Sequence, residues 1–170
     1  MTTRVSAVNV RRSLAAAAVV LAVPVLSSCG VNFNAQTDQV YNPAVGVDDR
    51  SGAVDVLNAL VVSGTDGSGA LVATLVNNDR TQPDQLTKVA GAGQDQALQV
   101  TLTAPKEVKP GGLVNLATEG PIPVRGERVV AGNFVEITFS FDRGEAITLK
   151  APVVSADNPA YADVKVPGAS

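Results

Sequence analysis

A strict alternation of apolar and polar side chains makes residues 134–141 the clearest structural element in the chain. A period of two places successive side chains on opposite faces of a strand, so this segment has one buried and one solvated face. The run Asp142–Glu145 supplies a short reversal, and residues 146–154 then alternate again. We expect the two segments to pair as an antiparallel hairpin. The apolar positions are Val135, Ile137, Phe139 and Phe141 in the first segment and Ile147, Leu149, Ala151 and Val153 in the second.

Other short strands are predicted upstream, each bounded by clusters of Gly, Pro, Asn or Asp. Residues 54–62 and 70–76 are the strongest of these, and the flexible segment Gly64–Gly69 separates them. Residues 54–62 could also be drawn as a helix, but their Val-rich sequence favours a strand. About seven short strands separated by turns predict an all-β fold, a single antiparallel β-sandwich. The weaker strands are expected at 85–90, 97–102, 113–116 and 122–130.

Segments without apolar periodicity flank this domain, which we place at residues 53–154. Residues 29–52 are rich in Asn and Gly and are expected to form a flexible tether. Residues 155–170 contain two prolines and a glycine, so we expect a disordered C-terminal tail. The adjacent acids Asp48 and Asp49 could help to bind a cation, but we favour a solvated turn.

The N-terminus has the three-part organisation of a bacterial secretory signal. Arg4, Arg11 and Arg12 precede an uncharged apolar run of 13 residues, Leu14–Leu26. This run is shorter than the ~20 residues that a membrane-spanning helix needs, and Pro24 further disfavours an uncleaved anchor. The paired arginines also resemble a twin-arginine export signal, although a plain basic region fits the flanking residues better. The sequence leaves open which of the two export routes is used.

Residues Leu26–Cys29 resemble the lipobox of bacterial lipoproteins, in which small residues precede the Cys that accepts lipid. The resemblance implies that the signal peptide, residues 1–28, is cleaved between Ser28 and Cys29, and that the Cys29 thiol is diacylated. An ordinary cleaved signal would not need a Cys at this junction, and Cys29 is the only Cys in the chain. Two acyl chains such as palmitate form a stable anchor where one would be marginal, at roughly 0.8 kcal/mol per buried methylene. We therefore expect a lipoprotein on the extracytoplasmic face of the cell membrane.

Composition and charge argue against several classes of function. Hydrophobic residues make up 45% of the chain, which is too much for a disordered protein. Three of the 13 basic residues lie in the signal region, which has no acid, so ten basic residues remain against 16 acidic ones. This acidic balance argues against a nucleic-acid partner and against electrostatic docking on anionic lipid.

The chain lacks most side chains on which catalysis and metal binding commonly depend. It has no His, its only Met is Met1, and its only Cys is expected to carry lipid. Ser-His-Asp and Cys-His arrangements are therefore impossible, and typical zinc and copper sites lack their ligands. The segment Gly64–Gly69 has no Lys and does not match a phosphate-binding loop. We expect no enzyme, no catalytic residue, no metal site and no cofactor, with acid-only and serine–lysine chemistry as open alternatives.

The remaining candidate chemistry depends on carboxylates or on clustered charge. Five glutamates are scattered singly, as solvated residues are. The run Arg125–Arg128, with the sequence Arg-Gly-Glu-Arg, could place a group of charges on a loop. We favour a solvated surface over a ligand site for these residues. The scattered glutamates are Glu107, Glu119, Glu127, Glu136 and Glu145.

Four segments carry a resemblance to a known family. Ala70–Asp79 is a strand that ends in an Asn-rich turn, and Gly111–Leu116 contains Gly-Gly-x-Val-x-Leu. Gly132–Phe141 is similar to the pattern Gly-x-x-Val-x-Leu-Thr-x-x-Phe, and Ala146–Val153 is a closing strand that ends in Pro-Val. In this order they resemble the periplasmic copper chaperones of the PCu(A)C family and, among them, actinobacterial lipoproteins of the LpqE group. The resemblance implies a cupredoxin-like or immunoglobulin-like sandwich.

The copper ligands of that family do not carry over to this chain. The resemblance places a His-x-Met pair near Ile122-Pro123-Val124, where no side chain has a ligand atom. A Cu(I) site made of thioether and imidazole groups is lost when apolar carbons replace them. The fold can therefore be shared without the copper chemistry.

These observations lead to one principal hypothesis and one alternative. The principal hypothesis is a membrane-anchored, non-enzymatic module that binds an envelope protein or a cell-wall component through the loops at one end of the sandwich. The membrane itself is the other expected partner, through diacylglycerol on Cys29. The alternative is a copper-chaperone-like protein that handles metal through a non-standard site.

Overall fold

The computed structural model describes residues 45–167, and this part of the chain is almost entirely β-structure. The predicted all-β fold is confirmed. One helix of four residues, α2 (Leu116–Glu119), and two single turns of 3-10 helix, η3 (Gly93–Asp95) and η4 (Pro159–Tyr161), interrupt the strands. The strands are β1 (Val47–Asp49), β2 (Val54–Ser63), β3 (Ser68–Asn77), β4 (Asp84–Gly91), β5 (Gln99–Val100), β6 (Lys106–Val108), β7 (Leu113–Asn115), β8 (Ile122–Arg125), β9 (Phe134–Phe141) and β10 (Ile147–Ser155).

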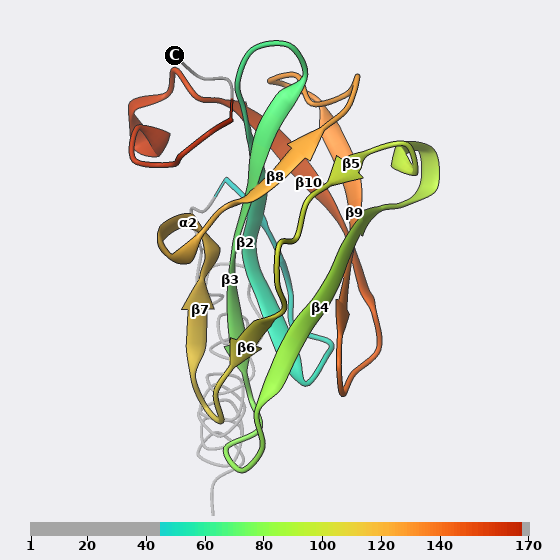
Figure 1. Ribbon diagram of the computed structural model, residues 1–170, viewed down its shortest axis with the longest axis vertical. Coiled ribbons are helices and arrows are strands. Elements are labelled where there is room, and N and C mark those ends of the chain that lie inside the picture. The colour runs from blue at the N-terminus through green and yellow to red at the C-terminus, as the bar shows by residue number, and fades with distance from the viewer. Residues whose placement is uncertain (1–44, 168–170) are drawn as a thin grey trace, which may run out of the picture. The chain divides into compact units, whose positions relative to one another are not determined.

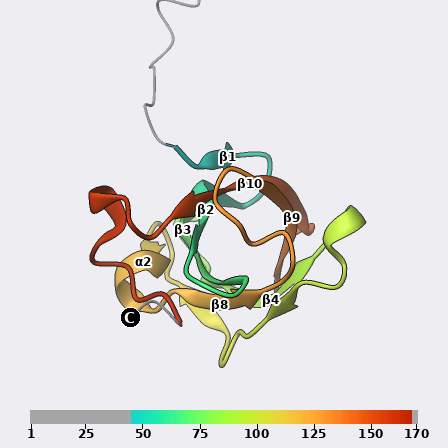
Figure 2. The same ribbon diagram turned by 90° about the horizontal axis from the view of Figure 1, so that it is seen from above.

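The strands form one sheet in the order β5-β8-β3-β2-β10-β9-β4-β6, with β1 added beside β2 and β7 beside β3 (Figure 1). All pairs are antiparallel except β2 with β10, which align in parallel over three positions. Seen from above, the sheet curls round so that β2, β3 and β8 face β4 and β9 (Figure 2). The expected sandwich is therefore built from one continuous sheet, and the β2–β10 pair joins its two layers.

The space between the two layers is filled by a single large core of aliphatic side chains and phenylalanines. The predicted hairpin is confirmed, because β9 pairs with β10 and Phe139 lies opposite Ile147. The alternation seen in the sequence has its expected effect, since the four apolar positions of β9 after Phe134 are buried and the positions between them are partly exposed. Fully buried members from both layers include Val61, Leu71, Leu75, Leu86, Ile137 and Phe139.

A second, smaller core lies on the outer face of β2 and β3, and the C-terminal segment covers it. The outward side chains Leu60, Val62, Ala70 and Val72 pack there with Val166. Residues 156–167 lie beside β2 and α2, outside the curled sheet (Figure 2). The predicted disordered tail is therefore wrong for residues 155–167, since β10 extends to Ser155 and the segment after it is packed.

The end of the predicted tether also differs from the structure, because β1 pairs with β2. Two side chains fix this contact: Asn58 accepts a hydrogen bond from the backbone N–H of Gly46, and Asp48 accepts one from the backbone N–H of Asn58. Asn58 has a positive φ of 50° and lies where the register of β2 against β3 shifts, so this is a β-bulge. Asp48 and Asp49 hold local structure: Asp48 also pairs with Arg50, and Asp49 accepts hydrogen bonds from Ser51.

Several element boundaries were predicted imperfectly. The strand expected at 97–102 is reduced to β5, and the strand expected at 122–130 ends at Arg125. The strand expected at 113–116 is confirmed as β7, which ends one residue early where α2 begins. Asn115 caps α2 by accepting a hydrogen bond from the N–H of Ala117. Strand β6 was not predicted at all.

The predicted signal peptide, its cleavage site after Ser28 and the lipid-accepting Cys29 lie outside the described residues, as does most of the tether. Among residues 45–167, no helix is long and apolar enough to cross a membrane.

Candidate functional site

Two neighbouring cavities open among the loops at the end of the sandwich that carries the β2–β3 hairpin. The larger has a volume of about 710 Å³ and the smaller about 380 Å³. They share Asp66 and Gly67 from the hairpin and Val130 from the β8–β9 loop. The larger cavity is otherwise lined by the η3–β5 segment and residues 125–128. The smaller is otherwise lined by residues 63–65, Val129, Ala131 and residues 155–157.

The walls of the larger cavity meet through a close backbone approach of two glycines. The N–H of Gly126 donates to the carbonyl of Gly67, with 3.0 Å between nitrogen and oxygen. Gly67 has a φ of +68°, and a Cβ on it would lie 2.8 Å from the carbonyl oxygen of Gly126. Only glycine meets both demands without strain. This bond continues the register of β8 against β3 by one position, and β8 ends there because the N–H of Val129 donates to the carbonyl of Gly126 and closes a turn.

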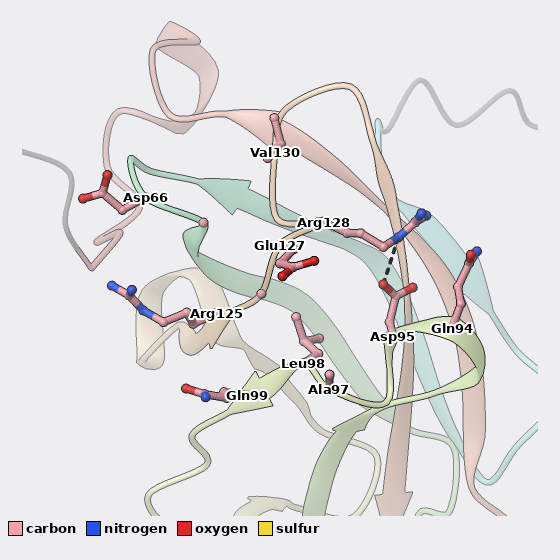
Figure 3. A pocket seen from close by; sticks show the side chains of 12 residues that line it. Asp66, Gln94, Asp95, Ala97, Leu98, Gln99, Arg125, Glu127, Arg128 and Val130 are labelled. Atoms are coloured by element: carbon pink, nitrogen blue, oxygen red, sulfur yellow. Dashed lines mark ion pairs between the residues drawn. The ribbon is translucent and has the colours of Figure 1, made fainter.

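An ion pair between Asp95 and Arg128 forms one wall of the larger cavity (Figure 3). The Arg128 Nε lies 3.0 Å from the Asp95 Oδ1, and the Asp95 side chain is only 3% exposed. Asp95 Oδ2 accepts a hydrogen bond from the backbone N–H of Glu136, which fixes η3 against β9. Arg128 Nη2 donates to the carbonyl of Phe134, so the guanidinium is held on two sides. Its Nε is buried and makes no hydrogen bond, because its N–H is not directed at the nearby carboxylate oxygen.

Three further charged side chains on the cavity wall have no partner among residues 45–167. They are Arg125, Glu127 and Asp66, all of them exposed. In Figure 3 the Glu127 carboxylate points toward the middle of the cavity, and the Arg125 side chain extends toward the side on which Asp66 lies. Charges that no neighbour satisfies are free to interact with a ligand that enters the cavity.

The structure therefore changes the interpretation of the run Arg125–Arg128, for which we favoured a solvated surface. These residues are solvent-accessible, but they also form a wall of the larger of the two cavities. Sequence reasoning missed Asp95, the buried partner of Arg128. Asp95 follows Gly91 and Gly93, where the chain leaves β4; these glycines indicate a turn, but nothing in the local sequence points to the partner of Asp95.

The other candidate residues from the sequence lie apart from the cavities or have structural roles. Glu119 caps α2 by accepting a hydrogen bond from the backbone N–H of Asn115. Glu107 is exposed on β6, and Glu136 is partly buried on β9. Glu145 lies in the turn between β9 and β10, away from both cavities. The segment Ile122-Pro123-Val124 belongs to β8 and pairs with β3.

A second charged cluster lies in the turns at residues 79–84 and 142–143, which belong to neither cavity. The hydroxyl and backbone N–H of Thr81, and then the guanidinium of Arg143, hold the pKa of Asp79 well below its ordinary value of 3.8. Arg143 Nη2 lies 3.1 Å from Asp79 Oδ2. Asp84 Oδ1 accepts from the backbone N–H groups of Gln85, Asp142 and Arg143. These contacts connect the turn at residues 79–84 to the turn at residues 142–143, so the cluster has a structural role.

The domain offers few donor atoms for a metal ion. In the part of the chain that the structure describes, no group of three or more His, Cys, Asp or Glu side chains could hold a metal ion. The same residues include no His, Cys or Met. The nitrogen and sulfur donors on which Cu(I) sites depend are therefore not present in the domain.

Comparisons with known proteins find no matching protein-family model and no matching curated protein. Solved structures do match. The copper-bound PCuAC domain from PmoF2 has a TM-score of 0.53 and 19% identity, and the match covers 64% of this chain and 98% of that domain. The apo PCuAC domain from PmoF1 has a TM-score of 0.52 and 20% identity, and the match covers 64% of this chain and 99% of that domain. The apo PmoF2 PCuAC domain matches equally well, with a TM-score of 0.53 at 18% identity, over 65% of this chain and 97% of that domain. At these identities the likeness establishes the fold: the chain has the β-sandwich architecture of PCuAC domains.

Proposed function

We propose that this chain is a lipid-anchored extracytoplasmic lipoprotein whose β-sandwich is a non-enzymatic binding module for an envelope component. The observation that carries the proposal is the larger cavity, where Arg125, Glu127 and Asp66 have no partner in the described domain. Such a site suits recognition of a polar ligand, because its charges are exposed and its walls are fixed by backbone contacts. The domain also lacks His and Cys, so it offers no imidazole as a general base and no thiol as a nucleophile.

The anchoring part of the proposal rests on Cys29 and the signal-like segment before it. In cells grown with labelled palmitate, the chain should incorporate the label and sediment with membranes. Cys29→Ala should abolish incorporation, whereas the matched substitution Ser27→Ala, which keeps a small residue, should not. Equal labelling of the Cys29→Ala chain would show that the lipid is not on this residue.

Binding at the cavity can be tested by site-specific photocrosslinking in intact cells. A photoreactive residue in place of Gln99, which is exposed on the cavity wall, should capture an envelope component. The same residue in place of Glu107, which is exposed on β6 and outside the cavities, should not. The proposal predicts that Arg128→Met weakens capture at position 99. Equal capture at both positions would mean that the cavity is not the binding site.

A second candidate function, copper handling, is favoured by the fold, since one neighbour is a copper-bound PCuAC domain. The side chains of residues 45–167 do not include the donor atoms that Cu(I) prefers, so this function would need a non-standard site. Titration of the chain with Cu(I), Cu(II) and Ca(II) separates the two functions. Stoichiometric uptake at micromolar concentration would favour metal handling, and no uptake would leave the binding module as the better account.

A further inference from the structure

We propose that the larger cavity binds a short zwitterionic peptide, one that presents both a carboxylate and an ammonium group. The inference rests on the proposed function, because it names a ligand class for the same cavity. Three properties of the cavity carry it: the balance of its charges, the fixed guanidinium of Arg128, and its size.

The charges of the lining are mixed in sign and close to balance. Two arginines and three acids line the cavity, and Asp95 already neutralises Arg128. Arg125 therefore remains with Glu127 and Asp66 as the charges without a partner in residues 45–167. A polyanion would be repelled by the two acids, and a neutral glycan would leave all three charges unmatched. A peptide with both signs of charge matches them.

The Arg128 guanidinium, whose charge Asp95 balances, is preorganised to donate hydrogen bonds to a carboxylate. Asp95 and the carbonyl of Phe134 hold it from two sides, so little side-chain freedom remains to be lost on binding. A guanidinium has five N–H donors in a planar fork, and these two contacts leave some of its N–H groups available to a ligand. Figure 3 shows the amide of Gln94 on the same side of the cavity as this guanidinium, where it can add a further hydrogen bond to a carboxylate.

The rest of the lining suits the other parts of a peptide. Glu127, whose carboxylate points into the cavity, and Asp66 offer partners for an ammonium group. Between the charged groups, Ala97, Leu98 and Val130 supply apolar surface for short side chains. The volume of about 710 Å³ falls in the range of small-ligand sites and accommodates a few residues.

The ligand class is tested by calorimetric titration of the full chain, isolated in detergent, with the synthetic peptide Ala-Glu-Lys-Ala. The peptide with free ends should bind. Its negative charges are removed by C-terminal amidation and by Gln in place of Glu. This should weaken binding about 10- to 100-fold, because a hydrogen bond to a charged group contributes about that much to affinity. Removal of its positive charges, by N-acetylation and norleucine in place of Lys, should have a similar effect. Equal affinity for all three peptides would overturn the proposal.

Two variants connect the binding to the cavity. Arg125→Gln and Glu127→Gln should each weaken binding of the peptide with free ends about tenfold, which corresponds to about 1.4 kcal/mol. Their matched controls Arg80→Gln and Glu107→Gln should leave the affinity unchanged, because both residues are exposed outside the cavity. All four side chains lack a partner in the described domain, so the fold should be retained in each variant. An equal loss in the controls would overturn the proposal.

A further titration, with a peptide that has D-alanine at its C-terminus, distinguishes the possible sources of the ligand. Tighter binding of this form points to peptides of the cell wall, and tighter binding of the L-form points to protein ends. If no peptide binds while crosslinking at position 99 persists, the zwitterionic ligand is wrong and the binding module stands. If both fail, the proposed function fails with it.

Discussion

The ion pair between Asp95 and Arg128 permits a prediction in which a second substitution rescues the first. The two partners differ in environment: the Asp95 side chain is 3% exposed, whereas that of Arg128 is 42% exposed. Removal of the arginine leaves a buried carboxylate without its counter-charge. Removal of the carboxylate's charge leaves an arginine that water can reach. The two single variants should therefore have unequal costs.

The magnitudes follow from the contacts that each variant loses. In Asp95→Asn the side-chain oxygen can still accept from the backbone N–H of Glu136, so we expect a loss of about 0.5–1.5 kcal/mol. In Arg128→Met the chain loses the hydrogen bond to Phe134 and leaves the Asp95 charge buried and unpaired, which costs about 2–4 kcal/mol. The double variant has no buried charge and should be more stable than Arg128→Met by about 1–2 kcal/mol.

Equilibrium unfolding in urea measures all four proteins on one scale, and similar m values would show that the denatured state is unchanged. The reasoning requires that Asp95→Asn stabilise the protein in the Arg128→Met background although it destabilises the wild type. If the double variant is as unstable as the sum of the single variants, the two groups are not coupled. The ion pair would then have no energetic role in holding the cavity wall.

Three further predictions concern other parts of the fold. Val166→Ala removes two methyl groups from the outer core and should lower stability by about 1–2 kcal/mol in urea unfolding, while exposed Lys165→Ala should not. Gly67→Ala places a Cβ against a backbone carbonyl at a positive φ and should lower the free energy of unfolding by about 1–3 kcal/mol. The control Gly144→Ala should not, because a Cβ at that position meets nothing within 4 Å. The lowered pKa of Asp79 in the folded state means that its stabilising contribution is complete above the ordinary value of 3.8 and is lost as the pH falls below it. Asp79→Asn should therefore lose less stability than the wild type between pH 5 and pH 2.5, and identical pH curves would contradict this reasoning.

The strands that have one buried face could be predicted from the sequence, because alternation is a local signal. Residues 134–141 and the strand that follows show it without interruption, and the structure pairs them. The packed C-terminal segment was missed, although the chain carried a sign of it. Residues 59–62 and 70–73 are apolar without alternation, which is the pattern of strands buried on both faces. Something had to cover their second face, and residues 156–167 do so.

The cavity could be predicted only in part. The run Arg125–Arg128 was visible as a concentration of charge, but its partner Asp95 lies 33 positions before Arg128 and joins it only through the fold. No local pattern reports a contact of this kind. The early end of β8 was missed as well: the strand stops where the N–H of Val129 donates to the carbonyl of Gly126 and closes a turn.

The parallel pair between β2 and β10 has a consequence for the order in which the chain can fold. Its hydroxyl-to-carbonyl bond, from Ser63 to Val154, joins positions 91 residues apart. Until residue 155 is available, one edge of β2 has no β10 partner and the outer face of β2 and β3 has no cover. Contacts so distant in sequence slow folding, and an uncovered apolar strand invites association with other chains. Refolding should therefore be slow for a domain of this size, and a chain that ends before β10 should aggregate.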